Sequence, residues 1–543
     1  MATVTAPPIV QINVAEVQAL LVRLQPQVAP GDYQMVDGMA RTIQLLDELL
    51  ERRDLTLAKL RQMIFGVCSE RMKDVFPENA AVPPGEESSS KGLAAASREE
   101  PQAAPEKRKG HGRNGAGDYG GAQHIPVPLP GMTTGCVCWK CQRGKVYRME
   151  SGSVVRIVGR PALQARIYEP ERWRCNLCDE IFTAPLPPEA GDKKYDETAG
   201  SMIALLKYGS GVPFYRLQGL QESLQVPLPA ATQWELVAEV AKQATPAWEA
   251  LLTEAAQGTV LHNDDTTMTV LSLKEENDGP EAPERKGVFT SGIVSVREGW
   301  KAGMFFTGRK HAGERLEELL QRRAAELGSP IQMCDALERN LPKAFKVILS
   351  NCLAHGRRKF VEQAVNFPAE SRHVLDRLAE VYRYDELAKE QGLDPEQRLA
   401  FHQTNSGPIM ESLRLWLQTQ LAEKKVEPNS GLGQAIGYML KRWDPLTLFL
   451  RQAGAPLDNN ICEQALKMTI LHRKNALFYK TENGAHVGDI LMSLIHTCRL
   501  NGVNPFDYLT AIQKHAKQMR TDPAKWLPWN YQEQLKSSPT DTG

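Results

Sequence analysis

The stretch VLHNDDTTMTVL (residues 260–271) places two adjacent aspartates, Asp264 and Asp265, inside a run that otherwise predicts a β-strand. Strands are poor in aspartate, because its short polar side chain competes with the backbone ladder and is costly to bury as an anion. Acidic residues at such positions need either a functional reason or a local bulge, and the surrounding sequence helps to decide between them.

After residue 258 the pattern is that of a mixed α/β sheet. Four strand-like segments follow the first one: GVFTSGIVSV (287–296), KAGMFFTG (301–308), PIQMCDAL (330–337) and a last strand within FKVILSNCLAHGRRKF (345–360). The segment AGERLEELLQRRAAEL (312–327) predicts a helix between the third and fourth strands. Residues 362–450 have a helical pattern, and a last helix carries NNICEQALKMTILHRKN (459–475). Strands and helices mixed in this order favour an α/β sheet.

Three acids in this region lie where a purely structural role is hard to assign. Asp264 lies within the first strand, Asp335 ends a later strand, and Glu463 lies on the last helix. Brought together without a counter-charge, three carboxylates repel one another, but with divalent ions between them they form a hard oxygen site suited to Mg²⁺. Two such ions can activate a water or a 3′-hydroxyl and stabilise the leaving oxygen of a phosphodiester. One acid on the first strand, one on a later strand and one on a following helix is the ribonuclease-H arrangement. For each acid alone, a bulge, an edge position or a solvated helix face is the alternative.

Two basic clusters lie close to these acids in the sequence. The first cluster follows a predicted strand and comprises His355, Arg357, Arg358 and Lys359. The second follows Glu463 by about two helical turns and comprises His472, Arg473 and Lys474. Guanidinium and ammonium groups beside a metal site would hold DNA phosphates. Solvated basic helix edges are the alternative.

The N-terminal part predicts a coiled coil and a linker. Apolar residues recur in an a/d heptad pattern from Val36 to Val67, broken once at Arg53, which favours a dimer over an amphipathic helix packed in its own domain. Residues 77–125 are rich in Pro, Gly, Ser and Ala and have too few large apolar residues for a core. The linker ends in KRKGHGR, whose Lys107, Arg108, Lys109 and Arg113 either lie along DNA phosphates or simply keep the segment soluble.

Two CxxC pairs predict a structural zinc site. Cys138 and Cys141 form one pair, and Cys175 and Cys178 form the other; four thiolates suit a closed tetrahedral site. Reduced structural cysteines are the alternative, and Cys136 could substitute for Cys138. Next, FYRLQGLQESL (214–224) and AATQWELVAEVAKQA (230–244) predict two helices joined by a short turn, a pattern that fits a helix-turn-helix but is common elsewhere.

Composition is compatible with a soluble cytosolic protein. The chain has 543 residues, 42% of them hydrophobic. Its 65 basic and 65 acidic residues give no net charge, so any charged surface comes from segments in which one sign is concentrated. Ten cysteines are too few for a disulfide scaffold in a chain of this length. No apolar run approaches the roughly 18 residues of a membrane span, and no signal segment is recognisable.

Several motifs together resemble those of the insertion sequence 66 family of DDE transposases. The motifs are LRQMIFGVCSER (60–71), LHNDDTT (261–267), CLAHGRRKF (352–360), LDNNICEQAL (457–466), HRKNALF (472–478) and SLIHTCRLNGVNPFDYL (493–509). The resemblance implies a multidomain α+β chain. Its parts would be a coiled-coil dimerisation helix (12–76), a disordered basic linker (77–125), a zinc-ribbon-like domain (126–190), a helical DNA-binding segment (191–257), a ribonuclease-H-like catalytic domain (258–480, with a helical insertion at 362–450) and a small C-terminal helical domain (481–530).

The resemblance also implies an activity. A homodimer would bind the terminal inverted repeats, cleave element ends and join them to target double-stranded DNA, in the bacterial cytoplasm at the nucleoid. Asp264, Asp335 and Glu463 would hold two Mg²⁺ or Mn²⁺ ions, zinc would be structural, and small accessory proteins of the same element are expected partners.

Four positions, one or two beside each acid, depart from the family pattern. Asp265 stands where Glu is usual, Ala336 and Leu337 replace Gly-Tyr after the second acid, and Gln464 replaces an arginine after the third. These departures keep two rival hypotheses open: a catalytically decayed, sequence-specific DNA-binding regulator, and a nuclease that cuts without joining.

Overall fold

The computed structural model describes residues 33, 36–37, 133–137, 141–143, 145–147, 162–174, 181–280 and 282–537. The predicted coiled coil and basic linker lie outside these residues, apart from Tyr33, Val36 and Asp37. The chain divides into two compact units, Pro83–Gln164 and the remainder. The helices and strands named here belong to the larger unit.

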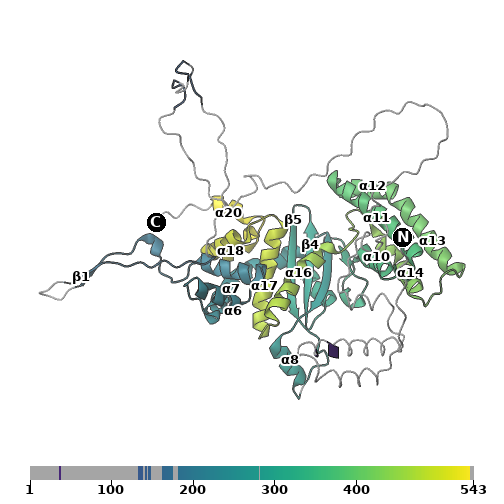
Figure 1. Ribbon diagram of the computed structural model, residues 1–543, viewed down its shortest axis with the longest axis horizontal. Coiled ribbons are helices and arrows are strands. Elements are labelled where there is room, and N and C mark those ends of the chain that lie inside the picture. The colour runs from purple at the N-terminus through teal and green to yellow at the C-terminus, as the bar shows by residue number, and fades with distance from the viewer. Residues whose placement is uncertain are drawn as a thin grey trace. The chain divides into compact units, whose positions relative to one another are not determined.

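A five-stranded mixed sheet forms the centre of the larger unit (Figure 1). Its strands, in spatial order, are β5 (Trp300–Gly308), β4 (Phe289–Arg297), β3 (Val260–Thr267), β6 (Ile331–Cys334) and β7 (Ile348–Asn351). β3 is antiparallel to β4 and parallel to β6, and β6 is parallel to β7. The expected mixed α/β sheet is therefore confirmed, and the parallel pairing brings the ends of β3 and β6 to the same edge.

Segment boundaries around the sheet differ from the sequence prediction. β3 ends at Thr267, and the charged segment between the first two predicted strands contains helix α8 (Leu271–Asp278). The helix predicted over 312–327 is shorter, because α9 (Ala312–Leu320) gives way to turns. Boundaries of this kind depend on tertiary contacts more than on the local pattern.

Helix α17 (Glu482–Leu500) covers the outer strand β5. Asp489, Ser493 and Thr497 recur every four residues and so lie on one face of α17. Their side-chain oxygens accept hydrogen bonds from the backbone N–H groups of Thr307, Phe305 and Gly303, at 2.7, 3.0 and 3.0 Å. The unpaired backbone groups of an exposed strand edge can pair with another chain, and here three side chains of one helix bond to those N–H groups.

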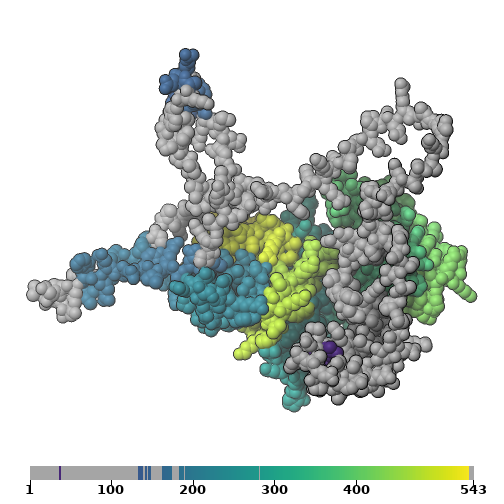
Figure 2. All heavy atoms as spheres, in the orientation of Figure 1, coloured from purple at the N-terminus to yellow at the C-terminus, as the bar shows by residue number. Residues whose placement is uncertain are grey.

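Two long helices far apart in sequence pack on the sheet. Helix α7 (Ala230–Ala255) contacts α17 and β5, and α16 (Asn460–Ala476) crosses β3 and β4. In Figure 2 the blue atoms of the α6–α7 region and the yellow atoms of the C-terminal helices form one continuous surface.

The two helices predicted at 214–244 are present as α6 (Phe214–Ser223) and α7, which continues eleven residues beyond the predicted end. Gln233, fully buried, donates to the carbonyls of Phe214 and Leu228 and so fixes the turn between them. The C-terminal helices α18 (Pro505–Lys514), α19 (Ala516–Thr521) and α20 (Tyr531–Ser537) follow α17.

Residues 362–450 are helical, as the sequence predicts. The main helices are α11 (Pro368–Glu390), α12 (Pro395–Asn405), α13 (Gly407–Ala422) and α14 (Gly431–Lys441). Their buried apolar residues join Val260 of β3, Ile331 of β6 and Leu353 in one core. Within the described residues, no helix is both long and apolar enough to cross a membrane.

Candidate active site

Asp264 lies on β3 and faces the other acids. Its Oδ1 accepts a hydrogen bond from the backbone N–H of Asp265 at 2.8 Å. Burial, together with the negative charges of Asp335, Asp265 and Glu463, raises the pKa of Asp264 to about 7, although that hydrogen bond acts in the opposite direction. A carboxylate that holds its proton near neutral pH indicates a site where negative charge is concentrated and a cation is favoured.

Asp335 directly follows β6, and Asn340 connects it to Asp264. The Asn340 amide nitrogen lies 2.5 Å from Oδ1 of Asp335 and 3.5 Å from Oδ1 of Asp264. Asn340 is itself fully buried, and its backbone carbonyl accepts hydrogen bonds from the side-chain amides of Asn263 and Gln332 at 2.8 and 2.7 Å. One amide therefore donates toward both carboxylates from a fixed position.

Glu463 lies in the first turn of α16, which Asn459 anchors to β3. The fully buried Asn459 side chain donates to the carbonyl of Asn263 at 3.1 Å and shares a 3.1 Å hydrogen bond with His262. Burial lowers the pKa of His262 to about 4, so this ring is neutral. At Gly292, opposite Asp264 on β4, an added Cβ would lie 2.9 Å from Leu466 of α16, so glycine permits this close approach.

Asp265 takes no part in this convergence. Its side chain is 1% exposed and forms ion pairs with His311 at 2.8 Å and Arg339 at 3.2 Å. Consecutive strand residues point to opposite faces, so Asp264 faces α16 and Asp265 faces α9. Sequence reasoning missed Asn340, Arg339 and His311. Arg339 and Asn340 lie in DALERN, the segment that departs from the family pattern, and Asp335 at its start was the available signal.

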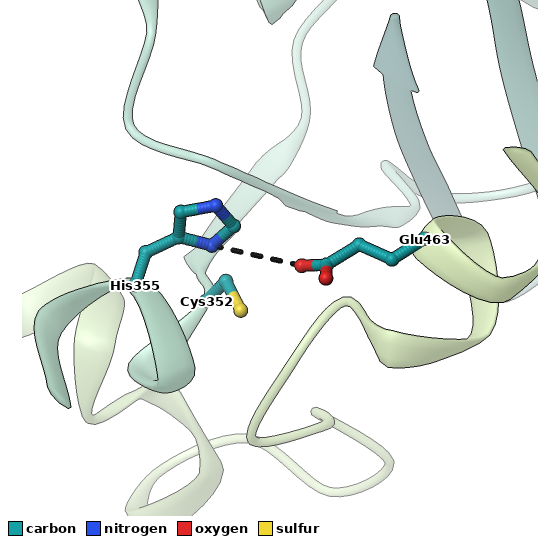
Figure 3. A group of neighbouring side chains, drawn as sticks. All are labelled: Cys352, His355 and Glu463. Carbon is teal, nitrogen blue, oxygen red and sulfur yellow. Dashed lines mark ion pairs between the residues drawn. The ribbon is translucent and has the colours of Figure 1, made fainter. Parts of the chain in front are cut away.

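Cys352 and His355 lie beside Glu463 (Figure 3). The three potential ligand atoms are all within 4.8 Å of one another, and His355 Nδ1 is 3.8 Å from Glu463 Oε1. Cys352 precedes α10 (Leu353–Val361), His355 lies in its first turn, and Glu463 comes from α16. Burial raises the pKa of the Cys352 thiol to about 11.

Comparison with known proteins identifies the family. The model of the family described as "Transposase IS66 family" matches residues 194–487, more than half of the chain, including all three acids and both basic clusters. The chain belongs to the IS66 family of transposases. The resemblance noted from the motifs is thereby confirmed, and family membership implies DNA as a partner and dependence on divalent metal ions.

Two relatives of this IS66 family protein occur in Sinorhizobium fredii (strain NBRC 101917 / NGR234). It is similar to the uncharacterized protein y4jD, with 25% identity over 503 residues, which cover 88% of this chain and 93% of that protein. It is also similar to the uncharacterized protein y4hP, with 26% identity over 384 residues, which cover 66% and 67% of the two chains. Both names leave the activity unstated, so mechanistic detail rests on the site itself.

The basic residues of the IS66 transposase motifs have different surroundings. Arg473 donates to the side-chain hydroxyls of Thr266 and Thr267 at 3.2 and 2.6 Å, at the end of β3. His472 is buried and its ring stacks on that of Tyr479, whereas Lys474 is exposed. Lys359 of α10 is exposed, while Arg357 and Arg358 are half-buried.

The remaining predicted site residues are only partly described. Lys107, Arg108, Lys109 and Arg113 lie outside the described residues, as do Cys138, Cys175 and Cys178, whereas Cys141 is exposed and Cys136 half-buried. Val137 and Lys145 form an antiparallel bridge around the first CxxC pair. Strands β1 (Arg172–Arg174) and β2 (Ile181–Thr183) pair on either side of the second. Antiparallel pairing of the residues that flank each CxxC pair is compatible with zinc knuckles.

Proposed function

We propose that this protein cleaves DNA strands at the ends of an insertion sequence and joins them to target DNA, with Asp264, Asp335 and Glu463 as its catalytic acids. The observation that carries the proposal is the approach of Asp335 and Glu463 to Asp264, close enough for their charges to raise its pKa. The acids come from a first strand, the end of a parallel strand and a helix that packs on the first strand.

The strand order supports the same proposal. The order β5-β4-β3-β6-β7, with only β4 antiparallel to both of its neighbours, is the order of the ribonuclease-H fold. In that fold the first strand occupies the centre of the sheet, and its acid lies next to the acid that follows the fourth strand. Asp264 and Asp335 have these positions.

The residues fit divalent metal ions of the Mg²⁺ class. Three carboxylates offer hard oxygen ligands, and the protonation of Asp264 near neutral pH is the response expected when no cation balances them. Two Mg²⁺ or Mn²⁺ ions held there would supply activation of the attacking oxygen and stabilisation of the leaving one.

The chain's own residues position these ligands. Asn340 donates to Asp335 and points its amide toward Asp264, which limits rotation of both carboxylates. Asp265 holds Arg339, the residue before Asn340, and so fixes the short helix that carries this amide. Asn459 fixes the start of the helix that carries Glu463. Precise placement of this kind is the main protein contribution to in-line phosphoryl transfer.

DNA binding is the other half of the proposal. Lys359 and Lys474, both exposed, suit phosphate contacts near the acids, with the half-buried Arg357 and Arg358 beside Lys359. We assign end recognition to the zinc-ribbon-like domain (126–190) and the helical segment (191–257), with the basic linker as an additional phosphate-binding segment. Dimerisation through residues 12–76, accessory proteins of the same element and association with the nucleoid belong to this proposal.

The test is an in vitro cleavage assay on the genomic DNA that flanks the gene. Wild-type protein with Mg²⁺ or Mn²⁺ should nick the inverted-repeat termini and form strand-transfer products, and Glu463→Gln should do neither while still binding the end DNA. Sequence-specific binding without cleavage by the wild type would instead favour the decayed regulator. Cleavage without joined products would favour a nuclease.

A further inference from the structure

We propose that Cys352, His355 and Glu463 form a binding site for a zinc ion, and that zinc bound there inhibits DNA cleavage. The first part concerns metal binding alone. The second rests on the proposed function, because it requires Glu463 to be a ligand of the catalytic ions.

The geometry brings a sulfur, a nitrogen and an oxygen to one point (Figure 3). Tetrahedral zinc with ordinary bond lengths places pairs of such ligand atoms about 3.3–3.6 Å apart. Here Nδ1 of His355 is 3.8 Å from Oε1 of Glu463, and all three atoms lie within 4.8 Å. Both side chains are about a quarter exposed, at 24% and 29%, so small rotations can close the difference.

Two of these atoms lack hydrogen-bond partners. His355 Nδ1 and Glu463 Oε1 are buried, and among the described residues neither makes a hydrogen bond. A buried polar atom without a partner costs about 1–3 kcal/mol, so such atoms usually have a reason to remain. A cation between them satisfies both, since Nδ1 of a neutral imidazole and a carboxylate oxygen each offer a lone pair.

The donor set favours zinc over magnesium. Magnesium prefers oxygen ligands only, whereas a thiolate, an imidazole and a carboxylate together are ligands that zinc accepts. Binding breaks the Cys352 S–H bond, forms a zinc–sulfur bond and releases the proton to solvent. The backbone N–H of Asn459 lies 3.3 Å from Cys352 Sγ and donates to it, which stabilises the resulting thiolate.

Zinc at this site changes the role of Glu463. Its Oε1 faces His355, which belongs to a different element from Asp264 and Asp335. A carboxylate oxygen held by zinc beside Cys352 is withdrawn from the ions that the three acids share. Three protein ligands leave a fourth position open, so the bound zinc remains exchangeable. Zinc and the catalytic ions therefore compete for one side chain.

The decisive experiment uses Co²⁺ as a spectroscopic substitute for zinc, on the full-length protein without DNA. Wild type, Cys352→Ser and His355→Gln are titrated, and bound cobalt and the thiolate-to-cobalt charge-transfer absorption are measured. Cys498→Ser, which alters an equally buried thiol on α17, is the matched control. Because the predicted ribbon cysteines contribute equally to every variant, only differences between variants are scored.

We expect Cys352→Ser to bind one cobalt ion fewer per chain than wild type and to lose part of the charge-transfer absorption. His355→Gln should lower the affinity for that cobalt ion by at least about 100-fold, since the loss of even a group that only supports a metal ligand lowers metal affinity ten- to a hundredfold. Cys498→Ser should match wild type. Equal cobalt binding and equal spectra in wild type and Cys352→Ser would overturn the site. Should Cys352→Ser not fold, His355→Gln supplies the same comparison.

Inhibition is measured separately, as the ratio of cleavage with and without Zn²⁺ within each variant at fixed excess Mg²⁺. The zinc concentration that inhibits wild type should be at least about 100-fold lower than the concentration that inhibits His355→Gln. Equal sensitivity would overturn the competition for Glu463. If wild type binds cobalt through Cys352 but never cleaves DNA, the proposed function fails while the zinc site stands.

Discussion

Asp264 and Asp265 are neighbours on β3, yet their side chains have different partners: Asp265 pairs with His311 and Arg339, whereas Asp264 faces Asp335 and Glu463. Alternation along a strand is enough to separate them. The Asp265 carboxylate pairs with a guanidinium of the protein itself, whereas the Asp264 carboxylate is left to a cation from solution. The doublet that looks redundant in sequence therefore divides into a structural acid and a candidate ligand.

The first prediction compares Asp264→Asn with Asp265→Asn. Asp264→Asn should reduce strand cleavage by about a hundred- to a thousandfold, the loss typical of one missing electrostatic group, with little change in end-DNA binding. Asp265→Asn should instead lower the free energy of unfolding by about 1–3 kcal/mol, because it breaks a buried ion pair whose partners are partly exposed. Cleavage and gel-shift assays alongside urea denaturation separate the two effects. Loss of end binding in Asp264→Asn would make that residue structural.

Asn340 gives the second prediction. Asn340→Ala removes the amide that connects Asp335 and Asp264, so the Mg²⁺ concentration for half-maximal cleavage should rise by about 10–100-fold. The measurement is cleavage rate against Mg²⁺ concentration. Asn501→Ala, which removes hydrogen bonds between α17 and Lys301, is the control and should leave that concentration unchanged. Equal shifts in both variants would indicate a general loss of structure.

Sequence patterns predicted the strands and the placement of the acids on them, because strand alternation and helix periodicity are local properties. They could not identify Asn340, because it lies in the short helix Glu338–Asn340, whose fold brings its side-chain amide to the Asp335 carboxylate. Nor could they show that the guanidinium of Arg473, a predicted DNA contact, donates to Thr266 and Thr267 in the folded protein. Such partners lie 207 positions apart in the chain, beyond the reach of any periodicity.

Metal-free stability as a function of pH gives the third prediction. The folded-state pKa of Asp264, about 7, is above its ordinary value of 3.8. Its contribution to stability is therefore complete below about pH 4 and is lost as the pH rises through 7. In a chelator, Asp264→Asn should melt at a higher temperature than wild type at pH 8, and the difference should shrink toward pH 5.

Saturating Mg²⁺ at pH 8 should reverse this order, because only the wild type keeps the full set of carboxylates. Thermal melts at several pH values, with and without Mg²⁺, provide the measurement. Asp278→Asn, on the exposed face of α8, serves as the control and should follow wild type throughout. A pH-independent difference between wild type and Asp264→Asn would mean that Asp264 is ionised in the metal-free protein.

The helical insertion gives the fourth prediction through a buried ionic cluster. Asp385 is 5% exposed and contacts Arg398, Lys389 and His402 at 2.5, 2.6 and 3.2 Å. Burial alone would raise its pKa, but the His402 hydrogen bond and the Arg398 charge outweigh burial and hold the pKa of Asp385 well below its ordinary value. Stability from this group is therefore present above about pH 4 and lost as the pH falls through its folded-state pKa.

Asp385→Asn should lower the free energy of unfolding at pH 7 by about 3 kcal/mol, because it leaves the mostly buried Arg398 guanidinium without its carboxylate partner. This difference in the free energy of unfolding should shrink below about pH 4, where the stabilisation by the ionised Asp385 carboxylate declines in the wild type. Urea denaturation followed by tryptophan fluorescence provides the measurement, and Trp416 and Trp443 are the tryptophans that lie within the insertion. Glu380→Gln, in an exposed pair with Arg377 on the same helix, should change stability by no more than about 0.5 kcal/mol. Similar losses in the two variants would show that burial adds nothing to the Asp385 cluster, and that the insertion relies on its apolar core alone.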